Sequence, residues 1–212
     1  MIEYPKIETL FDRDEKFKVM PDKWRLPEFA YLCNNTWIWT EKIDGTNIRV
    51  EWIPGAPLGV IENSLRFGGK TDNAQMPPHL LRKLEQLFPE DKFKTLYPET
   101  PMVLYGEGFG AKIQKGGGNY NPTDCDFILF DVLIEKWWLE RSNVEDIASK
   151  LGIKVVPIVG TGILLSAVEK VRAGFNSTFG NFPAEGLVVR PDVSLMTRKG
   201  GRVIGKIKNK DF

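Results

Sequence analysis

The sequence predicts an α+β fold, because stretches with the two-residue period of strands alternate with stretches that have the period of amphipathic helices. An apolar fraction of 42% and a charged fraction of 27% are ordinary for a soluble protein of this class. With 212 residues, the chain is long enough to bury a sizeable core. We therefore expect a single domain over residues 1–212.

The most distinctive expected element is a β-hairpin over residues 37–52, in which aromatic and β-branched residues flank Asp44-Gly45. Alternation along its first strand places Ile38, Thr40 and Lys42 on one face. Lys42 then lies at the end of that strand, where a turn can present its amine to a ligand. An exposed lysine without a function is the alternative interpretation of this position.

The other elements are expected in order along the chain, separated by segments rich in glycine and proline. Residues 1–36 contain short apolar clusters that we expect to pack beside the hairpin, and no chemistry is assigned to them. A turn is expected at residues 54–57, and strands are expected at residues 58–62, 101–107, 127–134, 185–189 and 202–208. Helices are expected at residues 79–88, 143–151 and 163–173, the second with Asn143 as its N-cap and Gly152 as its stop.

The composition argues against several kinds of protein. No apolar run approaches the roughly 18 to 20 residues of a membrane span, and the N-terminus lacks the regions of a signal peptide, so we expect a cytoplasmic protein. Cys33 and Cys125 lack the spacing of a metal site and are interpreted as reduced core thiols. The single histidine, His79, suits a surface or capping role, which argues against histidine-based catalysis.

The charge of the chain is unevenly distributed. The formal net charge is +1, but residues 195–212 contain six basic side chains and one acidic side chain. A local patch that faces phosphate groups is one interpretation of this segment. A solvated tail is the other.

Six short segments carry lysine, arginine, glutamate or phenylalanine within the expected strands or next to them. In chain order they are Glu41-Lys42-Ile43-Asp44-Gly45-Thr46-Asn47, Leu65-Arg66-Phe67-Gly68, Leu104-Tyr105-Gly106-Glu107, Phe127-Ile128-Leu129-Phe130-Asp131-Val132, Glu185-Gly186-Leu187-Val188-Val189-Arg190 and Lys206-Ile207-Lys208. Over residues 41–208, this ordered set resembles that of the covalent nucleotidyltransferases, the superfamily of polynucleotide ligases and mRNA capping enzymes. The first of these segments resembles that of the nick-sealing branch of the ATP-dependent RNA ligases. It carries Asn47 two places after Gly45, where DNA ligases and capping enzymes usually carry arginine.

The resemblance implies two packed antiparallel sheets flanked by helices, the nucleotidyltransferase (ligase adenylylation domain) fold, with the nucleotide between the sheets. It also implies ATP and Mg²⁺ or Mn²⁺ as cofactors. Lys42 would take AMP from ATP and pass it to a 5′-phosphate end, after which a 3′-hydroxyl would displace AMP and seal the strand. Only about one free lysine in 10³ to 10⁴ is neutral at pH 7, so this amine needs a positive field from its neighbours.

The family's functional residues match individual positions of this chain. The catalytic positions are Lys42, Lys206 and Lys208. The nucleotide-binding positions include Glu41 and Ile43, which would read adenine through their backbones, and Phe130, which would stack on adenine. Arg66 and Glu107 would hold the ribose and phosphate. The remaining nucleotide-binding positions are Asn47, Glu185, Lys206 and Lys208. Glu185 would also place the magnesium ion. Without the resemblance, Phe130 would be assigned to the core, and the charged residues to the surface or to ion pairs.

The resemblance also suggests the partner, which would be RNA ends or a nicked duplex in nucleic acid repair, with DNA or hybrid strands as alternatives. We expect a monomer without membrane contact, and no C-terminal clamp or OB domain, because four residues follow Lys208. A DNA ligase or a capping-type guanylyltransferase would use the same lysine, and Asn47 argues against the second. A non-catalytic nucleic-acid-binding module would need none of the reactive residues, so the intact Lys42 and Glu185 argue against it.

Overall fold

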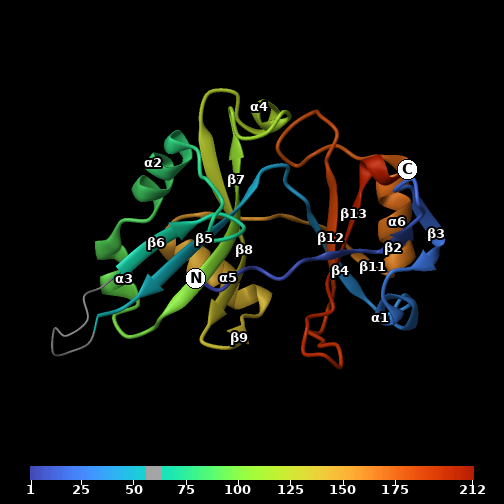
Figure 1. Cartoon of the computed structure of the whole chain (residues 1–212), viewed down its shortest axis with the longest axis horizontal. Coiled ribbons are helices and arrows are strands. Elements are labelled where there is room, and N and C mark those ends of the chain that lie inside the picture. Colours follow the sequence, from blue (N-terminus) through green and yellow to red (C-terminus); the bar gives the residue numbers. More distant parts are fainter. Residues whose placement is uncertain (56–63) are drawn as a thin grey trace. The chain divides into compact units, whose positions relative to one another are not determined.

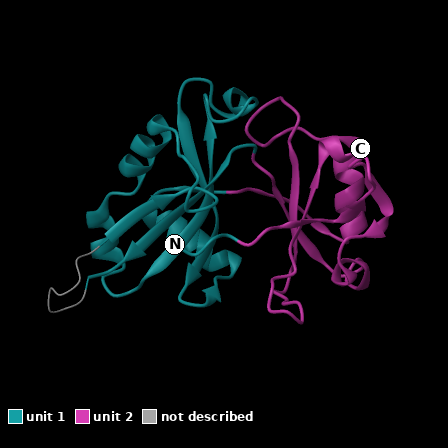
Figure 2. Cartoon of the chain, in the orientation of Figure 1, with its two compact units in different colours: residues 1–4, 44–155 teal, residues 5–43, 156–212 magenta. Residues whose placement is uncertain are grey.

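The computed structural model describes residues 1–55 and 64–212 (Figure 1). Part of the expected turn at residues 54–57 and the expected strand at residues 58–62 lie outside the described residues. The chain divides into two compact units (Figure 2): unit 1 comprises residues 1–4 and 44–155, and unit 2 comprises residues 5–43 and 156–212. The single adenylylation domain inferred from the sequence stays a prediction.

Unit 1 is built on a sheet with the strand order β10-β8-β7-β5-β6, in which β9 also pairs with β8. Its strand pairs are antiparallel, except that β10 runs parallel to β8. The strands are β5 (Thr46–Ile53), β6 (Ser64–Gly68), β7 (Met102–Gly110), β8 (Cys125–Ile134), β9 (Trp137–Trp138) and β10 (Lys154–Val155). The helices are α2 (Pro78–Leu87), α3 (Glu90–Leu96), α4 (Gly117–Tyr120) and α5 (Arg141–Leu151).

One face of the unit 1 sheet packs against α2, α3 and α5 and forms the core of this unit. Even-numbered residues of β7, and of β5 from Ile48 onward, lie on this face, where Trp52 and Leu104 are fully buried. Gly106 makes room for an aromatic ring here, because a Cβ at this position would lie 2.1 Å from Phe127 Cζ. Odd-numbered residues of β5 and β7 therefore point to the opposite face, which these helices do not cover.

Unit 2 contains a sheet with the order β1-β13-β12-β4-β11, in which β1 and β13 are parallel and the other pairs are antiparallel. The strands of this sheet are β1 (Glu8–Thr9), β4 (Trp37–Glu41), β11 (Ile158–Gly162), β12 (Gly186–Pro191) and β13 (Gly205–Lys208). A separate pair consists of β2 (Phe11–Arg13) and β3 (Val19–Trp24), and the helices are α1 (Pro27–Tyr31), α6 (Leu164–Ala173) and the 3₁₀ turn η1 (Asn209–Asp211). The core lies between α6 and one sheet face, where Trp37, Leu187 and Ile207 are buried.

The α+β prediction is confirmed, because helices pack on largely antiparallel sheets. The expected helices correspond to α2, α5 and α6, and the expected strands that lie within the described residues correspond to β7, β8, β12 and β13. The sequence expected β13 to begin at Arg202, but the strand begins at Gly205. Residues 1–36, for which the sequence predicted apolar clusters but no individual elements, fold as β1, β2, β3 and α1.

The predicted hairpin over residues 37–52 is wrong. Both strands exist as β4 and β5, but β4 pairs with β11 and β12 in unit 2, whereas β5 pairs with β6 and β7 in unit 1. Lys42 continues the unit 2 pairing, since its backbone N–H donates to Gly186 O at 2.9 Å. Gly45 lies against β7, where a Cβ would meet Gly108 O at 2.3 Å. Asp44-Gly45 is therefore a link between two sheets, because each strand finds partners that are distant in the sequence.

Three local expectations also need correction. The N-cap of α5 is Glu140, because the helix begins at Arg141, two residues before Asn143. Its predicted stop is confirmed, since Gly152 adopts a left-handed conformation with φ 68°. His79 is half-buried in the first turn of α2 and does not cap it. Glu107 lies within β7 and not at the end of that strand.

The cysteines and helices of the described chain add two further observations. Cys125 is buried in the unit 1 core and Cys33 is half-buried in unit 2, and both are free thiols. Burial raises the pKa of the Cys125 thiol.

Among the described residues, no helix has the length and apolarity needed to cross a membrane. The expected cytoplasmic location stays a prediction.

Candidate active site

Unit 2 brings Lys42, Glu185 and Lys208 into direct contact, and we call these three residues the lysine–glutamate cluster. Lys42 Nζ lies 2.6 Å from Glu185 Oε2, and Lys208 Nζ lies 2.5 Å from Glu185 Oε1. The side chains are about one-fifth exposed, at 21%, 18% and 21% respectively. One carboxylate therefore holds two ammonium groups at a place that a ligand can reach.

The cluster is positioned by the pairing of β12 with its two neighbouring strands. Gly186 pairs with Lys208 on β13, and Gly186 O accepts the backbone N–H of Lys42 at the end of β4. Gly186 has φ 155°, and a Cβ at this position would lie 2.1 Å from Ile207 O. A glycine is therefore required for the close strand contact that sets Glu185 beside both lysines.

Lys206 lies on the same sheet face as Lys208, because the two are separated by one residue of β13. This face is opposite to α6, since the intervening Ile207 packs in the core. Lys206 pairs with Thr9 of β1. Its charge also reaches Glu8, whose pKa is lowered mainly by a hydrogen bond from Lys6 and further by Lys206. Three lysines that the sequence marked as catalytic thus belong to one unit.

The same face of this sheet contains the side chains predicted from alternation in β4. Ile38 pairs with Arg190, and Thr40 pairs with Val188, which in turn pairs with Lys206. Trp37 and Trp39 instead pack with α6 in the core. The prediction that Ile38, Thr40 and Lys42 share a face agrees with this register.

In unit 1, four predicted nucleotide-binding residues share the sheet face opposite to its helices. Asn47 pairs with Glu107 across β5 and β7, and both side chains are half-buried. Asn47 Oδ1 is buried and accepts no hydrogen bond within the described residues. Arg66 on β6 is exposed, and its Nε donates to Ser64 Oγ at 3.0 Å. An acceptor without a partner beside a carboxylate suits a ligand that supplies hydroxyl or amino donors.

Phe130 lies on this face next to a β-bulge. The register of β7 with β8 shifts between Tyr105, which pairs with Asp131, and Gly106, which pairs with Leu129, so Phe130 is the extra residue. Phe130 is half-buried and packs with Tyr105 and Leu133, away from the helix-covered core. Alternation from Phe127 and Leu129, which pack in the helix-covered core, already places Phe130 on the opposite face, and the bulge puts Asp131 on that face as well.

Comparison with known proteins identifies the family. A sequence model described as RNA ligase matches residues 35–208. The chain belongs to the RNA ligase family. A search of curated proteins finds no match.

The solved structures most similar in fold include RNA ligases from Naegleria gruberi. A variant with AMP and manganese has a TM-score of 0.64 at 18% identity, covering 97% of this chain and 57% of that chain. Another variant with ATP and manganese has a TM-score of 0.66 at 17% identity, with 99% and 64% coverage. This member of the RNA ligase family therefore spans about three-fifths of the length of these ligases, and the likeness shows the shared fold.

The sequence of this RNA ligase family member gave no sign of the contacts made by the Glu41 side chain. Glu41 is 1% exposed, and its carboxylate accepts hydrogen bonds from Ser177 Oγ at 2.5 Å, Thr178 N at 2.9 Å and Thr178 Oγ1 at 2.7 Å. Its backbone N–H donates to Pro157 O at 3.1 Å. Glu41 thereby fixes the end of β4, immediately before Lys42, to the segment after α6. No local pattern indicates partners so distant in the sequence.

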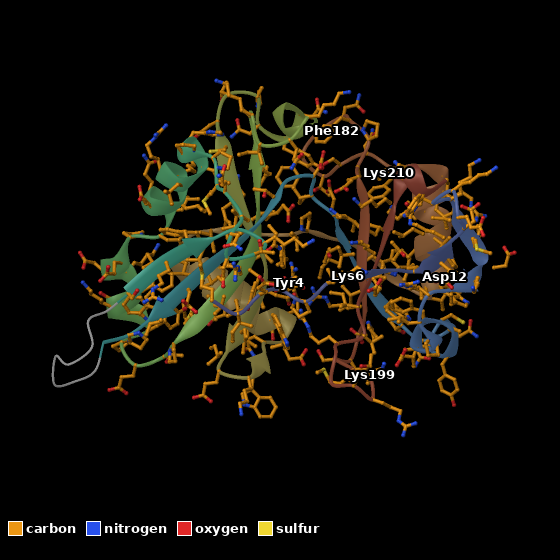
Figure 3. All side chains as sticks on the ribbon, viewed as in Figure 1. Tyr4, Lys6, Asp12, Phe182, Lys199 and Lys210 are labelled. Carbon is orange, nitrogen blue, oxygen red and sulfur yellow. The ribbon has the colours of Figure 1, made fainter. Side chains whose placement is uncertain are left out.

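The N-terminal segment, residues 1–4, also makes contacts that the sequence did not indicate. Tyr4, labelled in Figure 3, donates a hydrogen bond to the buried Asp131. Its ring centroid lies 5.0 Å from that of Phe130 in an edge contact. The fully buried Arg49 donates to Met1 O at 3.0 Å. Residues 1–4 therefore pack beside the predicted adenine-stacking ring, on the sheet face that carries Asn47.

Proposed function

We propose that this chain is the adenylylation part of an ATP-dependent RNA ligase, which joins 5′-phosphate and 3′-hydroxyl ends through a lysyl-AMP intermediate. The observation that carries the proposal is the lysine–glutamate cluster, in which one carboxylate holds Lys42 and Lys208. A lysine beside a proton acceptor and a second cation is suited to attack a phosphate group. Membership of the RNA ligase family supports this reaction class.

In the first step, the neutral amine of Lys42 attacks the α-phosphorus of ATP. A P–N bond forms, the bond between the α-phosphorus and the bridging oxygen breaks, and pyrophosphate leaves with that electron pair. Glu185 Oε2 lies 2.6 Å from Lys42 Nζ and accepts the proton that the amine loses. Lys206 and Lys208 offset the negative charge on the transferred phosphate and on the leaving group.

ATP and a divalent cation are the proposed cofactors, as in the Naegleria gruberi RNA ligase variant solved with ATP and manganese. Within residues 1–55 and 64–212, no group of three histidine, cysteine or acidic side chains could hold a metal ion. Glu185 fits the role of metal ligand, because Mg²⁺ in nucleotide sites is usually held by one or two carboxylates, phosphate oxygens and water. The cation supplies Lewis-acid stabilisation of the phosphate oxygens.

The unit 1 residues are proposed to bind ATP. Phe130 stacks on adenine, the Asn47 amide and the Glu107 carboxylate bind the ribose, and Arg66 binds phosphate. The buried, unpartnered Asn47 Oδ1 supports this assignment, because a ribose hydroxyl can donate to it.

The later steps transfer AMP from Lys42 to the 5′-phosphate of an RNA end. The P–N bond breaks and a 5′,5′ diphosphate forms. A 3′-hydroxyl then attacks the RNA phosphate, forms the strand phosphodiester and releases AMP. We propose RNA ends, in a nicked duplex or free, as the natural substrate and a monomer as the acting form.

Labelled nucleotides test this function. The chain is incubated with a divalent cation and α-labelled ATP, GTP or adenylate-labelled NAD, and the products are separated on a denaturing gel. Label retained from ATP, together with sealing of a nicked RNA duplex, is the expected result. Label from GTP would instead indicate a capping-type enzyme, and retention of no label would leave a non-catalytic binding module. Faster sealing of a DNA nick of the same sequence would move the chain to the DNA ligases.

A further inference from the structure

The connection between β12 and β13, residues 192–204, is an ordered extension of the unit 2 sheet, and we call it the β12–β13 hairpin. Val203 N donates to Leu195 O at 2.8 Å, and a bridge joins Met196 to Arg202. Near the tip, Thr197 N donates to Gly201 O at 2.6 Å. The hairpin therefore holds its tip, residues 198–200, in a defined turn beyond the sheet.

Two cations lie at this tip without an acidic partner. Arg198 and Lys199 are exposed, and neither forms an ion pair within the part of the chain that the structure describes. Figure 3 labels Lys199 at the outer end of the hairpin. Arg25, another exposed cation of unit 2, does pair with an acid, since its Nη1 lies 2.9 Å from Asp12 Oδ1. The tip is therefore a positive surface on a defined backbone turn, and no acidic side chain among the described residues pairs with its two cations.

We propose that the tip of the β12–β13 hairpin binds the phosphate backbone of the RNA strand that is being sealed. This inference rests on the proposed function, because it assigns a contact surface for the substrate of that reaction. Arg198 and Lys199 provide the charge complementary to phosphates. The hydrogen-bonded hairpin holds the backbone of the tip in place, so little backbone conformational entropy is lost on binding. The hairpin explains part of the positive charge concentrated after residue 195.

The chain connection limits how far from the reacting phosphate this contact lies. The hairpin leads directly into β13, and the seven residues from Lys199 to Lys206 span at most about 25 Å. An A-form RNA duplex rises roughly 2.8 Å per base pair, so the tip reaches phosphates up to about nine base pairs from the joint. The RNA contact should consequently depend on the length of the duplex arm.

The test compares Arg198→Ala/Lys199→Ala with a control that removes the same residue types from exposed positions of unit 1, Arg82→Ala/Lys136→Ala. Binding of a labelled nicked RNA duplex is measured by fluorescence anisotropy from 50 to 300 mM salt without ATP. Lysine adenylylation is measured separately. Loss of two phosphate contacts should reduce the slope of log affinity against log salt by about 1 to 2, and weaken binding about 10- to 60-fold at 0.1 M salt. Adenylylation should stay at the parent rate.

Shortening the duplex provides a second measurement on the same proteins. As the arms are shortened, the difference between the parent and the hairpin variant should disappear once the contacted phosphates, at most about nine base pairs from the joint, are removed. An unchanged salt slope, or an equal effect of the control variant, would overturn the proposal. A loss of RNA binding caused by Met196→Ala with no effect of the two charge substitutions would overturn it in favour of an apolar contact. Failure of the parent to adenylylate would reject the proposed function, whereas the binding data would still decide the hairpin.

Discussion

Replacement of Glu41 by alanine is expected to destabilise unit 2 by about 3 to 5 kcal/mol. Glu41 is 1% exposed and accepts three hydrogen bonds from Ser177 and Thr178. Hydrogen bonds to a charged group contribute roughly 1.5 to 3 kcal/mol each. Thr178 is exposed and can turn to water, but the hydroxyl of the buried Ser177 would lose its acceptor. The expected total is therefore smaller than the sum of three bonds.

Glu41→Gln keeps the shape of the side chain and one acceptor oxygen, so it should cost about 1 to 2 kcal/mol. Urea unfolding followed by tryptophan fluorescence measures both variants, since Trp37 and Trp39 lie on the same strand as Glu41. Glu15→Ala removes an exposed glutamate of the same unit and should stay within about 0.5 kcal/mol of the parent. A loss of unfolding free energy below about 1 kcal/mol for Glu41→Ala, or equal losses for Glu41→Ala and Glu41→Gln, would refute the structural role of the Glu41 carboxylate.

Three further predictions concern the site and the core. Glu185→Ala and Lys208→Ala should each reduce adenylylation by about 10²-fold or more with the melting temperature little changed, and unaltered rates would show that they are surface charges. Tyr4→Ala should raise the KM for ATP several-fold more than it lowers kcat, because Phe130 loses the ring beside it. Tyr4→Phe keeps a ring and should restore most of the affinity for ATP, so equal kinetics for the two variants would contradict the role of the Tyr4 ring. Cys125, buried with a raised pKa, should resist alkylation at pH 8 until the chain is denatured, and rapid native labelling would show that it is accessible.

The sequence predicted elements better than it predicted their pairing. Continuous apolar runs and two-residue alternation are both local properties, so β7 and β8 could be inferred from the first and the shared face of Thr40 and Lys42 from the second. The prediction of a hairpin over residues 37–52 was wrong because strand pairing depends on strands from other segments of the chain. β4 and β5 each have two neighbouring strands that come from later segments.

The candidate site shows the same division. The order of the motifs predicted Lys42, Glu185 and Lys208 as site residues, and the strand register explains how they come into contact. The sequence did not indicate the acceptors and donors around Glu41, whose partner Ser177 lies 136 residues later. It also gave no sign of the bulge at Phe130, because one extra residue in a strand leaves the apolar pattern almost unchanged.

Peptide mapping of the adenylylated chain tests the central claim most directly. After reaction with ATP and a divalent cation, the protein is digested and the residue that carries AMP is identified by mass spectrometry. The predicted result is AMP on the Nζ of Lys42 alone, with no adduct in Lys42→Arg, because arginine does not deprotonate to act as a nucleophile. AMP on another residue, or an undiminished adduct in Lys42→Arg, would contradict the assignment of Lys42 as the nucleophile.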